Sequence, residues 1–410
     1  MRCFFYIICM FSVQQLHGQT NWTKDIKTGC KVYNPDPQAE ETVSWSGDCK
    51  DGLADGTGTL IWYASGKEVV RVIAPFSKGI PNGKGKYILA SGGGDEGYFI
   101  DGQIVKLDEP YLNKIKKNYL SNTDSLDNYV GDGNAKSLFY YTITPKQKVK
   151  GVLVLICGTW ETAEHNINSN KALIQQAIDS NLTVIIPSIN QRLSLNSVVL
   201  SFFNTVFEVA IKQYHLPKDK FVIGGFSMGG IFSLRYAEMS IQDSSKTYIR
   251  PKAVYSVDGP TDLENQYYSF ERRFNNPRNT NKQEAEYAIN EFQKFMGGSP
   301  TEFRNQYIYY STFSKSEKDG GNAKYLKLPV RIYNDLDVNW WIINKGNDLY
   351  DMNALDQSAL INYLIGNGNN NAEFINAYGK GYRIEGNRHP HSWSIVEPSD
   401  CIKWLLKNLK

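Results

Sequence analysis

Short apolar runs separated by helical stretches fill the last two-thirds of the chain. Strands are predicted at six of these runs, most of them rich in β-branched or aromatic residues: 138–144, 151–156, 182–187, 221–225, 253–257 and 329–333. One helix face is predicted from the spacing of Val199, Phe203, Val206, Phe207, Ala210 and Tyr214. Runs this apolar, alternating with helices, predict an α/β domain whose mostly parallel sheet is covered by helices on both faces.

A repeated pattern distinguishes the N-terminal part. Gly, Asp and aromatic residues become frequent between Trp45 and Val105, and the segment 51–60 (DGLADGTGTL) has a second copy 27 residues later, at 78–87 (KGIPNGKGKY). A degraded third copy begins at Gly97. Each copy predicts a β-hairpin, because glycine supplies positive φ at turns while alternate apolar side chains face one side. The hairpins resemble MORN-type repeats, which implies a structural or docking module for a surface or a protein partner.

The first residues have the pattern of a secretory signal peptide. Arg2 precedes an unbroken apolar run from Cys3 to Val13, and the small residue Gly18 follows shortly after. The run is far shorter than the ~20 residues that a membrane-spanning helix needs, which argues against an N-terminal anchor. No other stretch is long and apolar enough to span a bilayer. We therefore predict cleavage close to Gly18 and a secreted or periplasmic mature protein without a membrane span.

Charge and cysteine content narrow the range of partners. Lys and Arg number 45 against 42 Asp and Glu, a net charge of +3, and no block of like charges stands out. This balance gives no electrostatic reason for a nucleic-acid or anionic-membrane partner. Cys30 and Cys49 lie close together in a chain bound for an oxidising compartment, which predicts a disulfide between them. Cys157 and Cys401 are expected to be unpaired.

Domain boundaries follow from these patterns. The assigned segments are 1–18 as signal peptide, 19–108 as a small all-β hairpin-repeat domain, 109–135 as a linker with some helix, and 136–410 as the α/β domain. An aromatic-rich insertion at 258–327 interrupts the α/β domain where a cap over an active site would sit. Helix signals inside it open one helix near Thr280 and a second at Ser299-Pro300, with Gly297-Gly298 ending the first.

The sharpest chemical signal is the segment 225–229, GFSMG, with Ser227 at its centre. The apolar run 221–225 leads straight into it, and helix-forming residues leave it. A sharp strand-to-helix turn flanked by glycines exposes a serine side chain at its tip, and the helix N-terminus favours a developing oxyanion. The region 138–410 therefore resembles the α/β-hydrolase superfamily, and we predict Ser227 as the nucleophile.

The resemblance implies a general base and an acid later in the chain, in the order Ser, Asp or Glu, His. His17 lies in the signal segment, so four of the five histidines remain, and only His389 and His391 follow Ser227. His391 is followed by Ser and Trp ahead of the last predicted helix, which matches the family's base better than His389 does. A metal site at this pair is disfavoured, because no acidic or thiol cluster completes it.

The acid is expected after strand 329–333. With Asn334 in the turn position, Asp337 falls where the family has its acid, and Asp335 is the first alternative. Asp258 and Asp262 are further candidates. A buried carboxylate that accepts a hydrogen bond from the imidazole would fix its tautomer and stabilise the imidazolium.

The oxyanion hole should use two backbone N–H groups. The resemblance implies the N–H of Met228, the residue after the nucleophile, and a second donor in the loop after strand 151–156. Thr159 is the better match for this second donor and Trp160 the next. Cys157-Gly158 stands where many relatives have His-Gly, and Cys157 itself is expected to be a buried thiol.

Together these features predict a secreted serine hydrolase that cleaves an ester or related acyl bond through an acyl-enzyme on Ser227. The substrate would be a small-molecule or polymer-borne acyl group, and no metal or organic cofactor is required. The competing hypothesis is a binding or structural protein whose hydrolase-type domain is inactive and whose hairpin repeats dock it to a partner.

Overall fold

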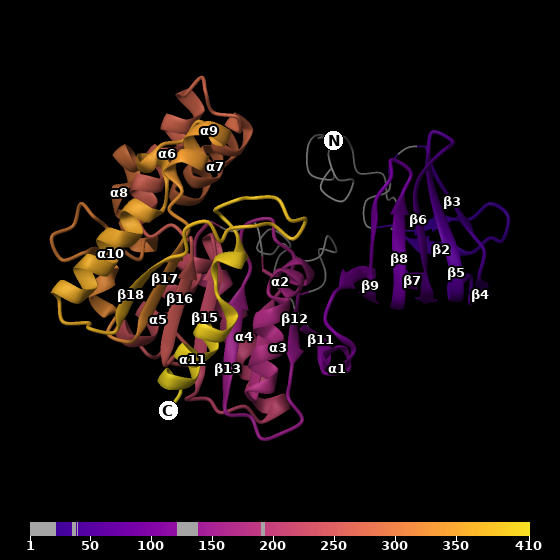
Figure 1. Cartoon of the computed structure of the whole chain (residues 1–410), viewed down its shortest axis with the longest axis horizontal. Coiled ribbons are helices and arrows are strands. Elements are labelled where there is room, and N and C mark those ends of the chain that lie inside the picture. Colours follow the sequence, from indigo (N-terminus) through magenta and orange to yellow (C-terminus); the bar gives the residue numbers. More distant parts are fainter. Residues whose placement is uncertain (1–21, 35–37, 39, 121–137, 190–192) are drawn as a thin grey trace. The chain divides into compact units, whose positions relative to one another are not determined.

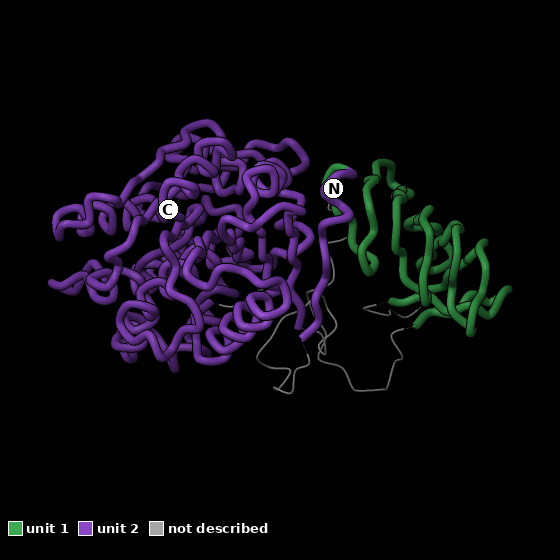
Figure 2. The backbone as a smooth tube through the Cα atoms, turned by 90° about the horizontal axis from the view of Figure 1, so that it is seen from below, with its two compact units in different colours: residues 1–108 green, residues 109–410 purple. Residues whose placement is uncertain are grey.

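The computed structural model describes residues 22–34, 38, 40–120, 138–189 and 193–410. The chain divides into two compact units, residues 1–108 and 109–410 (Figure 2). The predicted signal peptide at 1–18 and residues 121–135 of the predicted linker lie outside the described residues. In the part of the chain that is described, no helix has the length and apolar character needed to cross a membrane.

The N-terminal unit is a sheet of short, mostly antiparallel strands (Figure 1). Its strands are β1 (Trp22–Lys24), β2 (Lys31–Tyr33), β3 (Glu41–Trp45), β4 (Asp48–Lys50), β5 (Leu53–Ala64), β6 (Lys67–Ser77), β7 (Ile80–Pro81), β8 (Gly83–Leu89), β9 (Gly94–Ile100) and β10 (Gln103–Val105). The main path runs β1-β2-β5-β6-β8-β9-β10, with β3 and β4 on β5 and β7 on β6.

The repeated sequence pattern corresponds to repeated hairpin turns. Two-residue loops join β4 to β5, β6 to β7 and β9 to β10. Both residues of each loop have positive φ, namely Asp51-Gly52 (54° and 76°), Lys78-Gly79 (51° and 78°) and Asp101-Gly102 (48° and 85°). This conformation matches the twist of the flanking strands, and glycine adopts it without a steric penalty. The predicted β-hairpins are therefore present in all three copies.

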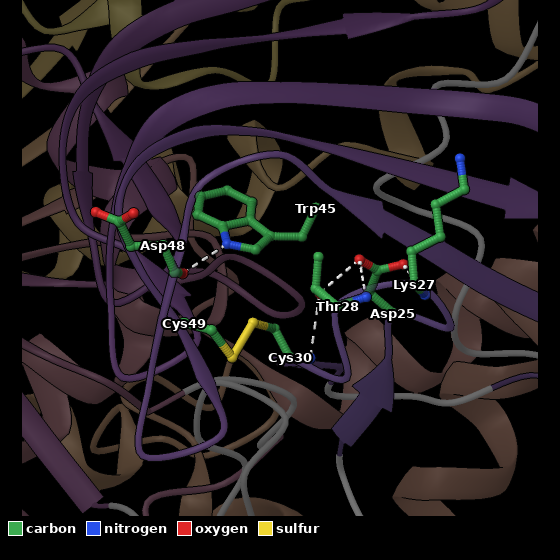
Figure 3. Close-up of a disulfide and its surroundings, with 7 residues drawn as sticks. All are labelled: Asp25, Lys27, Thr28, Cys30, Trp45, Asp48 and Cys49. Atoms are coloured by element: carbon green, nitrogen blue, oxygen red, sulfur yellow. Dashed lines mark hydrogen bonds between the residues drawn. A yellow bond between two sulfur atoms is a disulfide. The ribbon is translucent and has the colours of Figure 1, made fainter.

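A small core and a disulfide stabilise this unit (Figure 3). The buried indole of Trp45 lies 4.5 Å from the ring of Phe76, measured between centroids, and donates a hydrogen bond of 2.8 Å to the carbonyl of Asp48. The predicted bond between Cys30 and Cys49 is present, and it ties the start of β2 to β4. Such a link stabilises a unit with so thin a core mainly by restricting the unfolded chain.

The C-terminal unit contains the predicted, mostly parallel sheet. Its strands, in chain order, are β11 (Ile115–Leu120), β12 (Leu138–Ile143), β13 (Gly151–Ile156), β14 (Leu182–Pro187), β15 (Phe221–Phe226), β16 (Ala253–Val257), β17 (Val330–Asn334) and β18 (Ala372–Asn376). They pair in the order β11-β12-β14-β13-β15-β16-β17-β18, and every pairing from β14 to β18 is parallel. All six strands predicted from apolar runs are found.

Helices cover both faces of this sheet, as predicted. The α-helices of the whole unit are α1 (Glu109–Leu112), α2 (Ala163–Ser169), α3 (Lys171–Asp179), α4 (Ser197–Tyr214), α5 (Met228–Gln242), α6 (Leu263–Asn275), α7 (Lys282–Met296), α8 (Pro300–Tyr310), α9 (Val338–Lys345), α10 (Ala354–Gly366) and α11 (Pro398–Asn408). Helices α3 and α11 pack together on the near face in Figure 1. The apolar face of α4, with Phe203 and Phe207, packs in one core with Phe221 and Ile223 of β15.

One predicted helix is instead a strand. The segment 111–120 (YLNKIKKNYL) predicts helix within the linker, but the only helix there is the short α1, which ends at Leu112. Ile115–Leu120 forms β11, which pairs antiparallel with β12 at the edge of the sheet. The neighbouring apolar strand supplies hydrogen-bond partners for the β11 backbone, and this tertiary pairing outweighs the local helix preference.

The insertion predicted at 258–327 contains α6, α7 and α8. Ser299 and Glu302 form the expected capping box at the start of α8, and Gly297 ends α7 with φ of 91°. Phe292 of α7 and Tyr307 of α8 are buried in the same core cluster as Leu263 of α6. Figure 1 shows α6 and α7 together with α9 at one end of the unit.

Candidate active site

Ser227 occupies the turn between β15 and α5. Its backbone has φ of 53° and ψ of −123°, a conformation that residues other than glycine seldom adopt. Such strain is retained in proteins where surrounding structure enforces it, often at functional sites. Met228, the next residue, is the first of α5, so its N–H has no carbonyl partner within the helix.

Glycines on both sides of Ser227 permit close backbone contacts. A Cβ atom at Gly225 would lie 2.0 Å from the carbonyl oxygen of Gly229. A Cβ atom at Gly229 would lie 2.4 Å from the carbonyl oxygen of Ile156, at the end of β13. Any larger residue at either position would push α5 away from the sheet. The GFSMG pattern is therefore required by the packing of this turn as well as suited to catalysis.

His391 lies beside this turn and is hydrogen-bonded to Asp258. The imidazole Nδ1 is 2.6 Å from Oδ2 of Asp258, and the ring centroid is 4.4 Å from that of Phe226, the residue before Ser227. Asp258 directly follows β16, and the Ser227 N–H donates a 2.9 Å hydrogen bond to the carbonyl of Val257 at the end of that strand. Ser227, Asp258 and His391 thus gather at adjacent ends of β15 and β16.

This geometry corrects the sequence-based choice of acid. Asp337 is not the partner of His391: its carboxylate caps α9 through the Trp340 N–H at 3.0 Å and pairs with Nη2 of Arg388 at 2.9 Å. Asp337 follows β17, which lies one strand farther from β15, the strand before Ser227, than β16 does. Neighbouring strands are about 4.8 Å apart, so a carboxylate after β16 lies closer to the Ser227 turn than one after β17.

Asp335, the first alternative, anchors the loop that carries the histidine. Its buried carboxylate accepts hydrogen bonds from the N–H groups of Gly379 (3.0 Å) and Gly381 (2.8 Å) and pairs with Nη1 of Arg388 at 2.9 Å. Together with Asp337, it therefore holds the segment before His391 through the single guanidinium of Arg388. Asp262, the last candidate, caps α6 through the N–H groups of residues 264 and 265.

Buried amides position the Asp258 carboxylate. Asn334 donates from Nδ2 to Oδ1 of Asp258 (2.7 Å) and to Oε1 of Gln357 (2.9 Å). Gln357 in turn donates to the carbonyl of Gly259 (2.8 Å), and Asn353 donates to the carbonyl of Asp258 (2.8 Å). One carboxylate oxygen is therefore fixed by an amide while the other faces the imidazole. Asn334 was identified from sequence only as a turn residue, and its amide partnership needed the fold.

The loop after β13 approaches Ser227 from the other side. A Cβ atom at Gly158 would lie 3.3 Å from the Cβ of Ser227. Residues 158–161 form a turn closed by a 3.2 Å hydrogen bond from the Glu161 N–H to the carbonyl of Gly158. That bond uses neither the N–H of Thr159 nor that of Trp160, so closing the turn consumes neither donor.

Glu161 connects this loop to the segment after His391. Its buried carboxylate accepts from the Gly158 N–H at 2.9 Å and from the indole Nε1 of Trp393 at 2.8 Å and 3.1 Å. His165 Nδ1 lies 3.1 Å from the same carboxylate. One side chain thus binds both loops that border Ser227, and sequence analysis did not single it out because acceptor geometry leaves no sequence pattern.

We expect Glu161→Gln to lower kcat about 10- to 100-fold with a smaller change in KM. Glutamine offers one acceptor oxygen and an amide that would face an N–H group, so either Gly158 or Trp393 loses its partner, at a cost of about 1–3 kcal/mol. Steady-state kinetics on a soluble ester measure the effect. Trp393→Phe, which removes one donor but keeps an aromatic ring, is the matched variant. If Glu161 and Trp393 act through their hydrogen bond, kcat of the double variant falls by less than the product of the two single losses.

The remaining histidines and the thiol near the site have other environments. His389 packs against both Trp340 and Trp341, with ring centroids 4.9 Å and 5.6 Å away, and burial together with nearby positive charges lowers its pKa to about 2. His215 ends α4 in the left-handed conformation. Cys157 is buried, and burial raises its thiol pKa well above the ordinary value, as expected for an unreactive cysteine.

Among the described residues, no group of three or more His, Cys, Asp or Glu side chains is arranged to hold a metal ion. The groups described at this site are a serine, an imidazole, a carboxylate and backbone N–H groups. These are the groups of nucleophilic acyl transfer.

The strand order, the strained serine turn after β15 and the histidine loop before α11 define an α/β-hydrolase fold for the C-terminal unit. No protein-family profile matches the sequence, and no curated protein matches it.

Solved structures with a similar fold include several hydrolases of low sequence identity. The chain is similar to FphF, a fluorophosphonate-binding serine hydrolase of Staphylococcus aureus, with 14% identity and a TM-score of 0.42 over 71% of this chain and 98% of that one. It is similar to an S-formylglutathione hydrolase from Agrobacterium tumefaciens, with 10% identity and a TM-score of 0.44 over 72% and 95%. It is also similar to carboxyl esterase 2 of the fungus Tuber melanosporum, with 16% identity and a TM-score of 0.46 over 74% of this chain and 88% of that one.

Proposed function

We propose that this protein is a serine hydrolase that cleaves a carboxylic ester through an acyl-enzyme on Ser227. The observation that carries the proposal is the 2.6 Å contact between His391 Nδ1 and Asp258 Oδ2, next to the strained serine turn. A carboxylate at Nδ1 leaves Nε2 as the nitrogen that can take a proton from a serine hydroxyl. We assign Asp258 as the acid in place of Asp337.

The reaction would proceed in two balanced steps. Ser227 Oγ attacks the ester carbonyl while His391 Nε2 accepts its proton, and the same proton then passes to the departing alkoxide as the ester C–O bond breaks. Water attacks the acyl-serine with His391 again as base, which releases the carboxylic acid and restores the hydroxyl. The N–H groups of Met228 and Thr159 would stabilise the oxyanion in both steps.

We further propose that the protein is exported and that its N-terminal unit is a MORN-like docking module. The Cys30–Cys49 disulfide supports export, because disulfides persist mainly in oxidising compartments. The three equivalent hairpin turns support a repeat origin for the N-terminal unit. Docking requires no catalytic residue in the N-terminal unit. Its function would be to hold the hydrolase close to a surface or partner that carries the acyl substrate.

A fluorophosphonate probe tests the catalytic assignment directly. Wild-type protein is expected to become labelled in a 1:1 ratio, because the probe reacts with serines that an adjacent base activates. Ser227→Ala should remain unlabelled, with Ser233→Ala as the matched control, since Ser233 lies on α5 and donates to the carbonyl of Gly229. Intact mass spectrometry gives the stoichiometry. Unlabelled wild-type protein with normal circular dichroism would contradict the proposal and favour an inactive, binding function for this fold.

A further inference from the structure

The turn that borders Ser227 holds a tryptophan in a strained backbone conformation. Trp160 is the third residue of the 158–161 turn and has φ of 61°. Turns with positive φ at this position favour glycine or asparagine, and a bulky residue there is an outlier. A glycine would satisfy the turn without strain. The sequence instead keeps the largest side chain at a position that disfavours it, which points to a use for the indole itself.

The indole contacts a tyrosine and is partly exposed. Its ring centroid lies 5.0 Å from that of Tyr287 on α7, with the planes tilted by 50°, and the residue is 38% exposed. Tyr287 belongs to the helical insertion, so the contact links the loop at the nucleophile to the helices beyond the sheet. A purely structural tryptophan would be covered more completely, because burial is what stabilises a large apolar ring.

Contacts of the 158–161 turn place Trp160 close to Ser227 and to the proposed oxyanion donor. Gly158 lies directly against the Ser227 side chain, and Thr159, the proposed oxyanion donor, is the residue before Trp160. The Glu161 carboxylate holds the Gly158 N–H, and so keeps the turn from relaxing. A substituent on a carbonyl whose oxygen is bound at Thr159 would therefore come within reach of the indole.

We propose that Trp160 is a specificity-determining residue that stacks a planar aromatic ring of the ester substrate, carried on its acyl or its alcohol part. An alkyl chain would gain comparable contact from any apolar side chain, including one that fits the turn better. A rigid, partly exposed indole braced by a tyrosine instead suits the offset or edge-on arrangement that aromatic rings prefer. The proposal rests on the proposed function, since it assigns the substrate class of the same site.

Matched ester pairs test this inference. Benzyl acetate and cyclohexylmethyl acetate have similar alcohol leaving groups, but the ring is planar in the first and puckered in the second. Ethyl phenylacetate and ethyl cyclohexylacetate make the same comparison on the acyl part. In Trp160→Gly we expect kcat/KM to fall at least 10-fold for the aromatic member of one pair and less than about threefold for its cyclohexyl counterpart. Trp160→Phe should retain most of the wild-type kcat/KM for the aromatic ester, because it keeps an aromatic ring at this position.

Thermal unfolding of Trp160→Gly accompanies the kinetics and is expected to show a folded variant, because glycine adopts this φ freely and this offsets part of the lost contact with Tyr287. Equal losses for both members of each pair, or no loss for either, would overturn the proposal. Calorimetric binding of the same pairs to Ser227→Ala separates this failure from failure of the proposed function. A Trp160-dependent preference for aromatic esters in that inactive background supports the ring site even if wild-type protein hydrolyses none of them.

Discussion

Asp258→Asn is expected to lower kcat by about 10³- to 10⁴-fold while the protein stays folded. The carboxylate accepts from Nδ1 of His391, whereas an asparagine can present its amide N–H to the same nitrogen and stabilise the tautomer that carries the proton on Nε2. In that tautomer the imidazole cannot accept the Ser227 proton. Steady-state hydrolysis of a p-nitrophenyl ester measures the loss, and circular dichroism confirms the fold.

Asp337→Asn is the matched control, because it makes the same chemical change at the carboxylate that sequence analysis selected. Asp337 pairs with Arg388 and caps the short helix α9, so its loss should weaken the histidine loop only indirectly, with a reduction in kcat of at most about 10-fold. The two variants discriminate sharply between assignments. A large loss in Asp337→Asn together with a mild one in Asp258→Asn would contradict the geometry described above.

The sheet was predictable from sequence because its strands are fully buried. Every residue of β13, β14 and β16 is buried, and such strands appear in the sequence as continuous apolar runs. The edge strands β11 and β18 escaped prediction for the opposite reason. Ile115–Leu120 (IKKNYL) and Ala372–Asn376 (AEFIN) are only partly buried, so polar residues interrupt their apolar pattern.

The sequence alone was enough to select candidates for the nucleophile and the base, whereas selecting the candidate acid required the fold. Ser227 lies in a local strand-turn-helix pattern, and Gly225 is required by a contact with Gly229 only a few positions later, so the sequence itself indicates the turn. The acid requires only one carboxylate at the end of a strand close to the base, and three aspartates meet that description in sequence. The choice among Asp258, Asp335 and Asp337 depends on which strand neighbours β15 and on where Arg388 draws the other two carboxylates.

The hydrogen bonds that support the site were even less predictable from sequence than the acid. Glu161 and Trp393 are separated by 232 positions in sequence, yet they share a buried hydrogen bond across the site. Asn334 and Asp258 are 76 positions apart. Contacts of this kind depend on how loops from different strands converge at one edge of the sheet, and no local pattern of residues records that convergence.

His391→Ala is expected to lower kcat at least about 10⁴-fold, because serine oxygen is a weak nucleophile once its proton has no acceptor. His389→Gln, two positions earlier in the same loop, should change kcat by no more than about threefold. His389 packs against Trp340 and Trp341, and its lowered pKa keeps it neutral throughout the usual pH range, so it contributes no ionisation to the rate profile. The profile of rate against pH, measured from about pH 5 to about pH 9, where a histidine base changes its protonation state, should therefore have the same shape for wild type and His389→Gln.

Stability, unlike activity, should respond to His389 as the pH falls. An unfolded histidine binds a proton below its ordinary pKa of 6.5, whereas burial keeps His389 neutral in the folded protein down to about pH 2. The unfolded state thus binds more protons in this window, and wild-type stability decreases as the pH is lowered through it, by at most about 1.4 kcal/mol per pH unit for this one site. His389→Gln removes that dependence. Urea unfolding at a series of pH values below 6.5 should give a flatter stability profile for the variant, and parallel profiles would show that His389 is protonated in the folded protein after all.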